Sequence, residues 1–213
     1  MTCTIELRKI DIAPGQVLTL REIDWAEFDR IAAALGDRRT PRLTYSHSAL
    51  QLRMPSPEHE SIARLLGMLV TVWLEALDCD WVCLGSTTFR NEAAGVGVEP
   101  DDCFYLTNLD RVVGKARLGA GDPPPDLAIE VDITSPSSLP VYSALGVREV
   151  WRYRDGRLEF WVLAAGKYRS VAESEVCTGL PVAVVSAAVA RLGSEPMSRI
   201  RREFADWVGD RLG

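Results

Sequence analysis

Apolar residues recur at helical spacing in three stretches of the chain. Residues 24–36 begin with Asp24 and Glu27 at the spacing of a capping box and end at Gly36. Residues 56–77 begin with Ser-Pro, which favours a first helical turn, and carry a broad apolar face. Residues 195–211 carry a third apolar stripe, formed by Ile200, Phe204, Trp207 and Val208. This spacing predicts three helices.

Short runs of β-forming residues lie between these helices. The runs at 43–45 and 50–54 predict a hairpin around residues 46–48. Later runs predict strands near 81–89, 102–106 and 126–133, a long loop over 107–125, a short helix at 139–145, and a hairpin of 149–153 with 157–163. This order predicts an α/β fold with a mixed sheet flanked by helices.

The length of 213 residues suits one domain with small appendages. We expect an N-terminal arm and helix over 1–40, a core over 41–194 and a C-terminal helix over 195–213. No apolar run approaches the roughly 20 residues that span a bilayer, and no signal peptide is recognisable at the N-terminus. The five cysteines form no CxxC pair, so we expect reduced thiols and a cytoplasmic protein.

The net charge is −6, which argues against a broad, non-specific grip on nucleic acid. It leaves a nuclease open, because a bound metal offsets acidic residues locally. Only three of the 24 basic residues are lysines, namely Lys9, Lys115 and Lys167.

Two acidic clusters fall on neighbouring apolar runs, one around Asp101 and one around Glu130. Carboxylates in such runs cost desolvation free energy unless a positive group meets them. Two of them on adjacent strands repel each other unless a cation lies between them, and Mg²⁺ takes oxygen ligands of this kind. The clusters therefore predict a metal site suited to hydrolysis of a phosphodiester. Asp102 follows Asp101 and is expected on the other face of its strand.

Several motifs occur in the order found in a known family: Ser56-Pro57-Glu58-His59-Glu60, residues 84–90, Glu99-Pro100-Asp101, residues 123–134 and residues 144–153. Over about residues 40–208 the chain resembles the Uma family, bacterial predicted endonucleases with the restriction-endonuclease-like PD-(D/E)xK core. The resemblance implies a restriction-endonuclease-like sheet, Mg²⁺ (with Mn²⁺ as a substitute) and double-stranded DNA as the partner.

The resemblance also implies roles for single residues. Asp101 and Glu130 fall on the acidic motif positions, which implies catalytic metal ligands, and the carbonyl of Val131 would complete the metal shell. Glu58 or Glu60 resembles an added helical acid. The alternatives are an ion pair or strand-end carboxylate for the first two, and favourable placement at a helix N-terminus for the glutamates. His59 is open to metal binding or proton transfer, or to a surface or capping role.

The chain departs from the family pattern where lysine is expected, because that position is Asp132. The stretch after it carries no basic residue, and Lys115 is the only lysine near enough in sequence to substitute. A cation here would offset the charge that develops on the phosphate. Two hypotheses follow: a weakened Mg²⁺-dependent endonuclease, and a catalytically inactive DNA-binding or regulatory module on the same fold.

The apolar stripes at the two chain ends either cap the chain's own core or bury against a second copy. A symmetric homodimer is the expected assembly, because two-fold symmetry is the commonest arrangement and suits a duplex with two strands.

Overall fold

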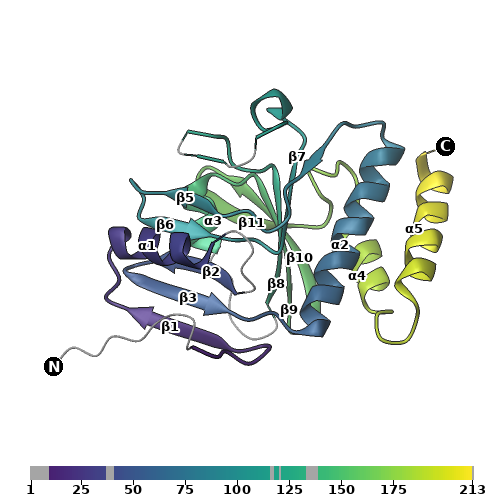
Figure 1. Ribbon diagram of the computed structural model, residues 1–213. Coiled ribbons are helices and arrows are strands. Elements are labelled where there is room, and N and C mark those ends of the chain that lie inside the picture. Colours follow the sequence, from purple (N-terminus) through teal and green to yellow (C-terminus); the bar gives the residue numbers. More distant parts are fainter. Residues whose placement is uncertain (1–9, 37–40, 116–117, 120, 133–138, 213) are drawn as a thin grey trace.

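The computed structural model describes residues 10–36, 41–115, 118–119, 121–132 and 139–212, and these form two β-sheets with helices between and beside them (Figure 1). The first sheet has five antiparallel strands in the order β1-β3-β2-β6-β5. Its strands are β1 (Val17–Arg21), β2 (Arg42–Ser46), β3 (Ala49–Arg53), β5 (Phe89–Asn91) and β6 (Val96–Val98).

The second sheet has six strands in the order β11-β10-β9-β8-β7-β4. Its strands are β4 (Val82–Cys83), β7 (Asp102–Tyr105), β8 (Leu127–Asp132), β9 (Glu149–Arg154), β10 (Arg157–Ala164) and β11 (Lys167–Val171). β8 and β9 run parallel, while the other pairs are antiparallel. The sheet is therefore mixed, as the sequence predicts.

The helices divide between the two sheets (Figure 1). α2, α4 and α5 lie together on the side of the six-stranded sheet that is remote from α1, and α1 covers the five-stranded sheet. α3 packs between the sheets, against β5 and β6 of the first sheet and β11 of the second. The helices are α1 (Trp25–Leu35), α2 (Pro57–Ala76), α3 (Leu139–Leu145), α4 (Val182–Val189) and α5 (Met197–Leu212), with a 3₁₀ turn, η2 (Leu109–Arg111), in the long loop.

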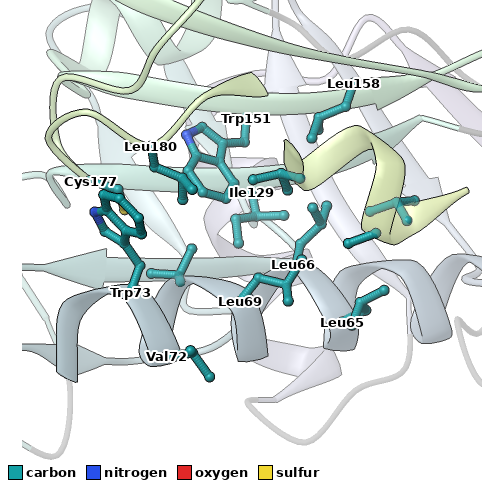
Figure 2. Packing of buried hydrophobic residues seen from close by; sticks show 14 of the residues in the cluster. Leu65, Leu66, Leu69, Val72, Trp73, Ile129, Trp151, Leu158, Cys177 and Leu180 are labelled. Carbon is teal, nitrogen blue, oxygen red and sulfur yellow. The ribbon is translucent and has the colours of Figure 1, made fainter. Parts of the chain in front are cut away.

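The main core lies between α2 and the six-stranded sheet. Figure 2 shows Leu66 and Leu69 of α2 pointing toward Ile129 of β8, and all three side chains are fully buried. Trp151 of β9 is also buried and stacks on Phe160 with ring centroids 4.0 Å apart. This packing holds the first turn of α2 near the end of β8, and the acidic clusters lie in that region.

Local sequence signals account for most of the elements. Asp24 and Glu27 form the predicted capping box of α1, and the Ser56 side chain caps α2. The first hairpin turns at His47 and Ser48, both at positive φ, as predicted for residues 46–48. The α/β class is confirmed, whereas β11, α4 and the separate five-stranded sheet were not predicted. The arm before α1 contributes β1, which pairs with β3.

The apolar stripe of α5 packs inside the chain. Ile200, Phe204 and Val208 are buried against the α2 side of the core, and Trp207 stacks on Trp73 at a centroid distance of 6.0 Å. Phe28 of α1 is likewise fully buried, between Trp25 and Tyr45. These stripes cap the chain's own core, so they give no support to the homodimer, which stays a prediction.

None of the described helices combines the length and the apolar character that a bilayer crossing requires.

Gly97 of β6 is required because the ring of Phe28 lies directly over it. A Cβ atom at this position would lie 2.7 Å from the Phe28 ring, which is fully buried and has no room to yield. We expect Gly97→Ala to lower the free energy of unfolding by about 1–3 kcal/mol through overpacking.

The control is Gly209→Ala in α5, where a Cβ meets nothing within 4 Å, so the free energy of unfolding should rise by up to about 1 kcal/mol. Urea unfolding of both variants measures this, and equal stability of Gly97→Ala and the wild type would contradict it.

Candidate functional site

The two acidic clusters meet where the sheets, α2 and α3 converge. Asp101 directly precedes β7, and Glu130 lies in β8, the strand that pairs with β7. The backbone N–H of Asp101 donates to the carbonyl of Ile129 at 3.0 Å, which fixes the two strands at this level. The first turn of α2 brings His59 to the same place, and the end of β3 brings Arg53.

Arg53 lies at the centre of this group. Its Nη2 donates to Oδ1 of Asp101 and to Oε2 of Glu130, each at 3.1 Å. Its Nη1 donates to the carbonyl oxygen of Val131 at 2.9 Å. Because both carboxylates contact the same nitrogen atom, their oxygens lie no farther apart than twice that contact distance. Asp101, Glu130 and the Val131 carbonyl therefore surround one guanidinium group.

Further hydrogen bonds fix the orientation of both carboxylates. Oδ2 of Asp101 accepts from the backbone N–H of Val131 at 2.8 Å, and Oε1 of Glu130 accepts from the hydroxyl of Tyr142 in α3. The side chains of Asp101 and Glu130 are only 1% and 4% exposed. The pair is thus rigidly held and almost completely removed from water.

Burial and neighbouring charges separate the behaviour of the two carboxyl groups. Burial raises the pKa of Asp101, but the charge of Arg53 and the contact with His59 outweigh it and hold the pKa below its usual value. Burial raises the pKa of Glu130 to about 8; Arg53 opposes the rise, and Asp101 and Asp132 add to it. Burial alone would lower the pKa of Arg53, yet the surrounding carboxylates raise it above its usual value. Asp101 is therefore held in its charged form, whereas burial favours the protonated form of Glu130.

His59 is buried beside Asp101 without a hydrogen bond to either ring nitrogen. Its Nε2 lies 3.0 Å from Oδ2 of Asp101, at an angle that does not form a hydrogen bond, and its Nδ1 lies 3.8 Å from Oε1 of Glu60. Its Nε2 is within ion-pair distance of Asp101, and this contact lowers the pKa of that carboxyl. This position is not that of a surface residue.

Arg42 adds a second positive group at the rim. It lies opposite Arg53 in the β2–β3 pairing, and its Nε is 3.9 Å from Oδ1 of Asp101. Its Nη2 is 3.6 Å from Oε1 of Glu60, whose side chain is 54% exposed. Glu60 is thus joined to the acidic pair through Arg42 and His59.

Asp102 points away from this group, as its place in the strand predicts. Its Oδ2 would lie 2.6 Å from a Cβ atom on Gly67 of α2, so the glycine leaves room for the carboxylate. Its Oδ1 accepts from the thiol of Cys83 at 2.9 Å. Burial raises the pKa of Asp102. Asp101 and Asp102 therefore serve two separate environments.

Three other predicted residues lie apart from the acidic pair or interact with it differently. Glu58 is exposed on the first turn of α2. Lys115 pairs with Asp122 in the long loop, and no contact among the described residues joins it to Asp101 or Glu130. Asp132, at the motif position of the lysine, is buried with Oδ1 3.7 Å from Nη1 of Arg53. Of the stretch after it, where the sequence lacks a basic residue, residues 133–138 lie outside the described residues and the rest begins α3.

Several other buried acids are structural. Asp126 accepts from the backbone N–H groups of Leu106 and Thr107, each at 2.8 Å, and so fixes the start of the long loop. Glu149 accepts from the indole of Trp151 and from two backbone N–H groups of residues 175–176. The number of acids in the motif region therefore overstates the number at the site.

The donors around Arg53 fit a hard divalent cation in their chemistry. They are two carboxylates and a carbonyl, all oxygen, with the imidazole of His59 beside them. Across the part of the chain that is described, no three or more His, Cys, Asp or Glu side chains are grouped as a metal cluster. Any metal here would therefore depend on the pair and on the backbone oxygen.

Sequence reasoning did not identify Arg53 or Tyr142 as members of the site. Arg53 ends a strand in which Leu50 and Leu52 face the α1 core, so alternation directs Arg53 to the opposite face. That alternation is a usable signal for its direction. It gives no signal for its partner, because Glu130 is 77 residues further along the chain.

Comparison with known proteins agrees with the fold. The crystal structure of "a putative nuclease belonging to DUF820" from Anabaena variabilis ATCC 29413 superposes with a TM-score of 0.53 at 12% identity, covering 78% of this chain and 99% of that one. No curated protein matches the sequence. The Uma2 family, described as "Putative restriction endonuclease", matches residues 25–188, which include Arg53, His59, Asp101 and Glu130. The chain belongs to this Uma2 family.

Proposed function

We propose that the protein is a divalent-metal-dependent endonuclease that hydrolyses phosphodiester bonds of double-stranded DNA in the cytoplasm. Mg²⁺ is the proposed metal, and Mn²⁺ the substitute. The observation that carries the proposal is that oxygens of Asp101, Glu130 and the Val131 carbonyl all surround the guanidinium group of Arg53. The free thiols of the four described cysteines agree with a reducing compartment.

In this proposal Asp101, Glu130 and the Val131 carbonyl hold the metal. The metal would supply an activated water and would offset charge on the phosphate. The chain's own part is positioning: the Val131 N–H orients Asp101, and the Tyr142 hydroxyl orients Glu130. Such outer contacts fix the direction of the ligand oxygens. In this scheme Glu60 lies at the rim of the site. A catalytic role for Glu58 stays a prediction, because no contact among the described residues joins Glu58 to Asp101 or Glu130.

Among the described residues, the guanidinium groups of Arg42 and Arg53 both lie within 4 Å of Asp101. Both are guanidinium groups, which stay charged and cannot act as a base. Their proposed contribution is electrostatic, toward a phosphate that approaches Asp101. This supports cleavage that is weaker than that of an enzyme with a lysine at position 132.

The second candidate is a catalytically inactive nuclease-fold module. The specific observation in its favour is that Arg53 pairs with both carboxylates in a nearly dry site. This is the ion-pair alternative for Asp101 and Glu130. A module of this kind would bind DNA or a regulatory partner without a metal. Cleavage of plasmid DNA distinguishes the two candidates.

We expect Asp101→Asn to abolish Mg²⁺- or Mn²⁺-dependent cleavage, because the amide keeps the shape of the carboxylate and removes its charge. The matched control is Asp102→Asn at the next residue, which faces Gly67 and Cys83. The control should retain cleavage within a few-fold of the wild type. The measurement is plasmid nicking with circular dichroism of each variant. Equal cleavage by Asp101→Asn and the wild type would remove Asp101 from the site.

Lys115→Ala should leave cleavage unchanged, since the Lys115 ammonium pairs with Asp122 and is 41% exposed. An exposed pair of this kind contributes little to stability, so the fold should also be retained. Single-turnover cleavage rates of Lys115→Ala and the wild type test this. A drop of two orders of magnitude would show that the long loop delivers the lysine to the phosphate.

A further inference from the structure

Arg53 contacts the same three oxygens that the proposed function assigns to the metal. Its two terminal nitrogens lie 2.9 Å from the Val131 carbonyl and 3.1 Å from each carboxylate. Its side chain is 11% exposed and is anchored in β3, which pairs with β1 and β2 on either side. The guanidinium is therefore a fixed part of the site and not a surface group that folds over it.

A divalent ion and this guanidinium exclude each other. Mg²⁺ and Mn²⁺ need oxygen ligands at about 2.0–2.6 Å, and one lone pair of each of the three oxygens is already directed at Arg53. Two cations on the same oxygens would also repel strongly, because the site is buried and poorly screened. Metal binding at this point therefore requires that Arg53 leave at least part of it.

We propose that Arg53 is a built-in counter-ion that competes with the divalent cation for Asp101, Glu130 and the Val131 carbonyl. It thereby sets the metal affinity of the site. The inference rests on the proposed function, from which it takes the identity of the metal ligands. Arg53 acts through those ligands, so it is a positioning residue.

Asp132 gives the displaced guanidinium a destination. Its Oδ1 lies 3.7 Å from Nη1 of Arg53, just beyond hydrogen-bond length. A short movement of the Arg53 guanidinium toward Asp132 would replace its hydrogen bond to the Val131 carbonyl by a charge-assisted hydrogen bond to the Asp132 carboxylate. The family pattern has a lysine at position 132, where this chain has an aspartate. The acid fits Arg53, because a lysine at this position would place a second positive charge against the guanidinium of Arg53. The charges of positions 53 and 132 are thus complementary.

The test is Mn²⁺ titration of the metal-free protein by isothermal calorimetry, with the wild type, Arg53→Gln and Arg191→Gln. Arg191 is the matched control, since it also joins two carboxylates, Glu195 and Glu203, far from the site. We expect Arg53→Gln to lower the Mn²⁺ dissociation constant about tenfold or more, the scale of one lost charge-assisted hydrogen bond. Arg191→Gln should match the wild type. Adding Asp101→Asn to Arg53→Gln should abolish the gain.

Arg53→Lys covers the case in which Arg53→Gln does not fold. An ammonium lacks the planar fork, so it releases at least one of the three oxygens while keeping the charge. Its Mn²⁺ dissociation constant should fall below that of the wild type by a smaller factor. Unchanged or weaker Mn²⁺ binding in the folded Arg53 variants would overturn the competition.

The outcomes separate this inference from the proposed function. A wild type that cleaves DNA with Mn²⁺, together with Arg53 variants that bind Mn²⁺ no more tightly, would overturn the competition and leave the endonuclease standing. A wild type that neither binds Mn²⁺ nor cleaves, together with tight binding by Arg53→Gln, would support the competition and overturn the endonuclease.

Discussion

The structure depends on burying two carboxylates and one guanidinium at the junction of two sheets. Asp101 and Glu130 would each be costly to bury alone, and Arg53 compensates both through one nitrogen atom. Because the acids belong to the six-stranded sheet and the arginine to the five-stranded sheet, this contact also ties the two sheets together. Removing one member would leave an uncompensated charge in the interior.

The same interaction explains why the site is chemically ambiguous. Three oxygen donors around one group suit a hard cation, and here they meet a cation that the chain supplies itself. Burial raises the pKa of Glu130 to about 8 even though Arg53 lowers it. A divalent ion would offer more charge to the same oxygens. In our proposal, the balance between these two cations decides what the fold does in this chain.

Local signals predicted much of the fold, because capping, alternation and helical spacing act within a few residues. The capping box at Asp24 and Glu27 and the strand around Glu130 are examples. The approach of Asp101 to Glu130 follows from strand pairing, and its prediction drew on the family resemblance as well. Arg53 could not be assigned in this way, since its partners are brought together by packing of two sheets. Lys115 was chosen for its proximity in sequence, and its ammonium pairs instead with Asp122.

The most direct test of the central claim is anomalous diffraction from a crystal grown with Mn²⁺, measured at the manganese absorption edge. The account predicts an anomalous peak coordinated by Asp101, Glu130 and the Val131 carbonyl, with the Arg53 guanidinium moved toward Asp132. An Arg53 still hydrogen-bonded to both carboxylates, with no anomalous peak between them at saturating Mn²⁺, would contradict the account.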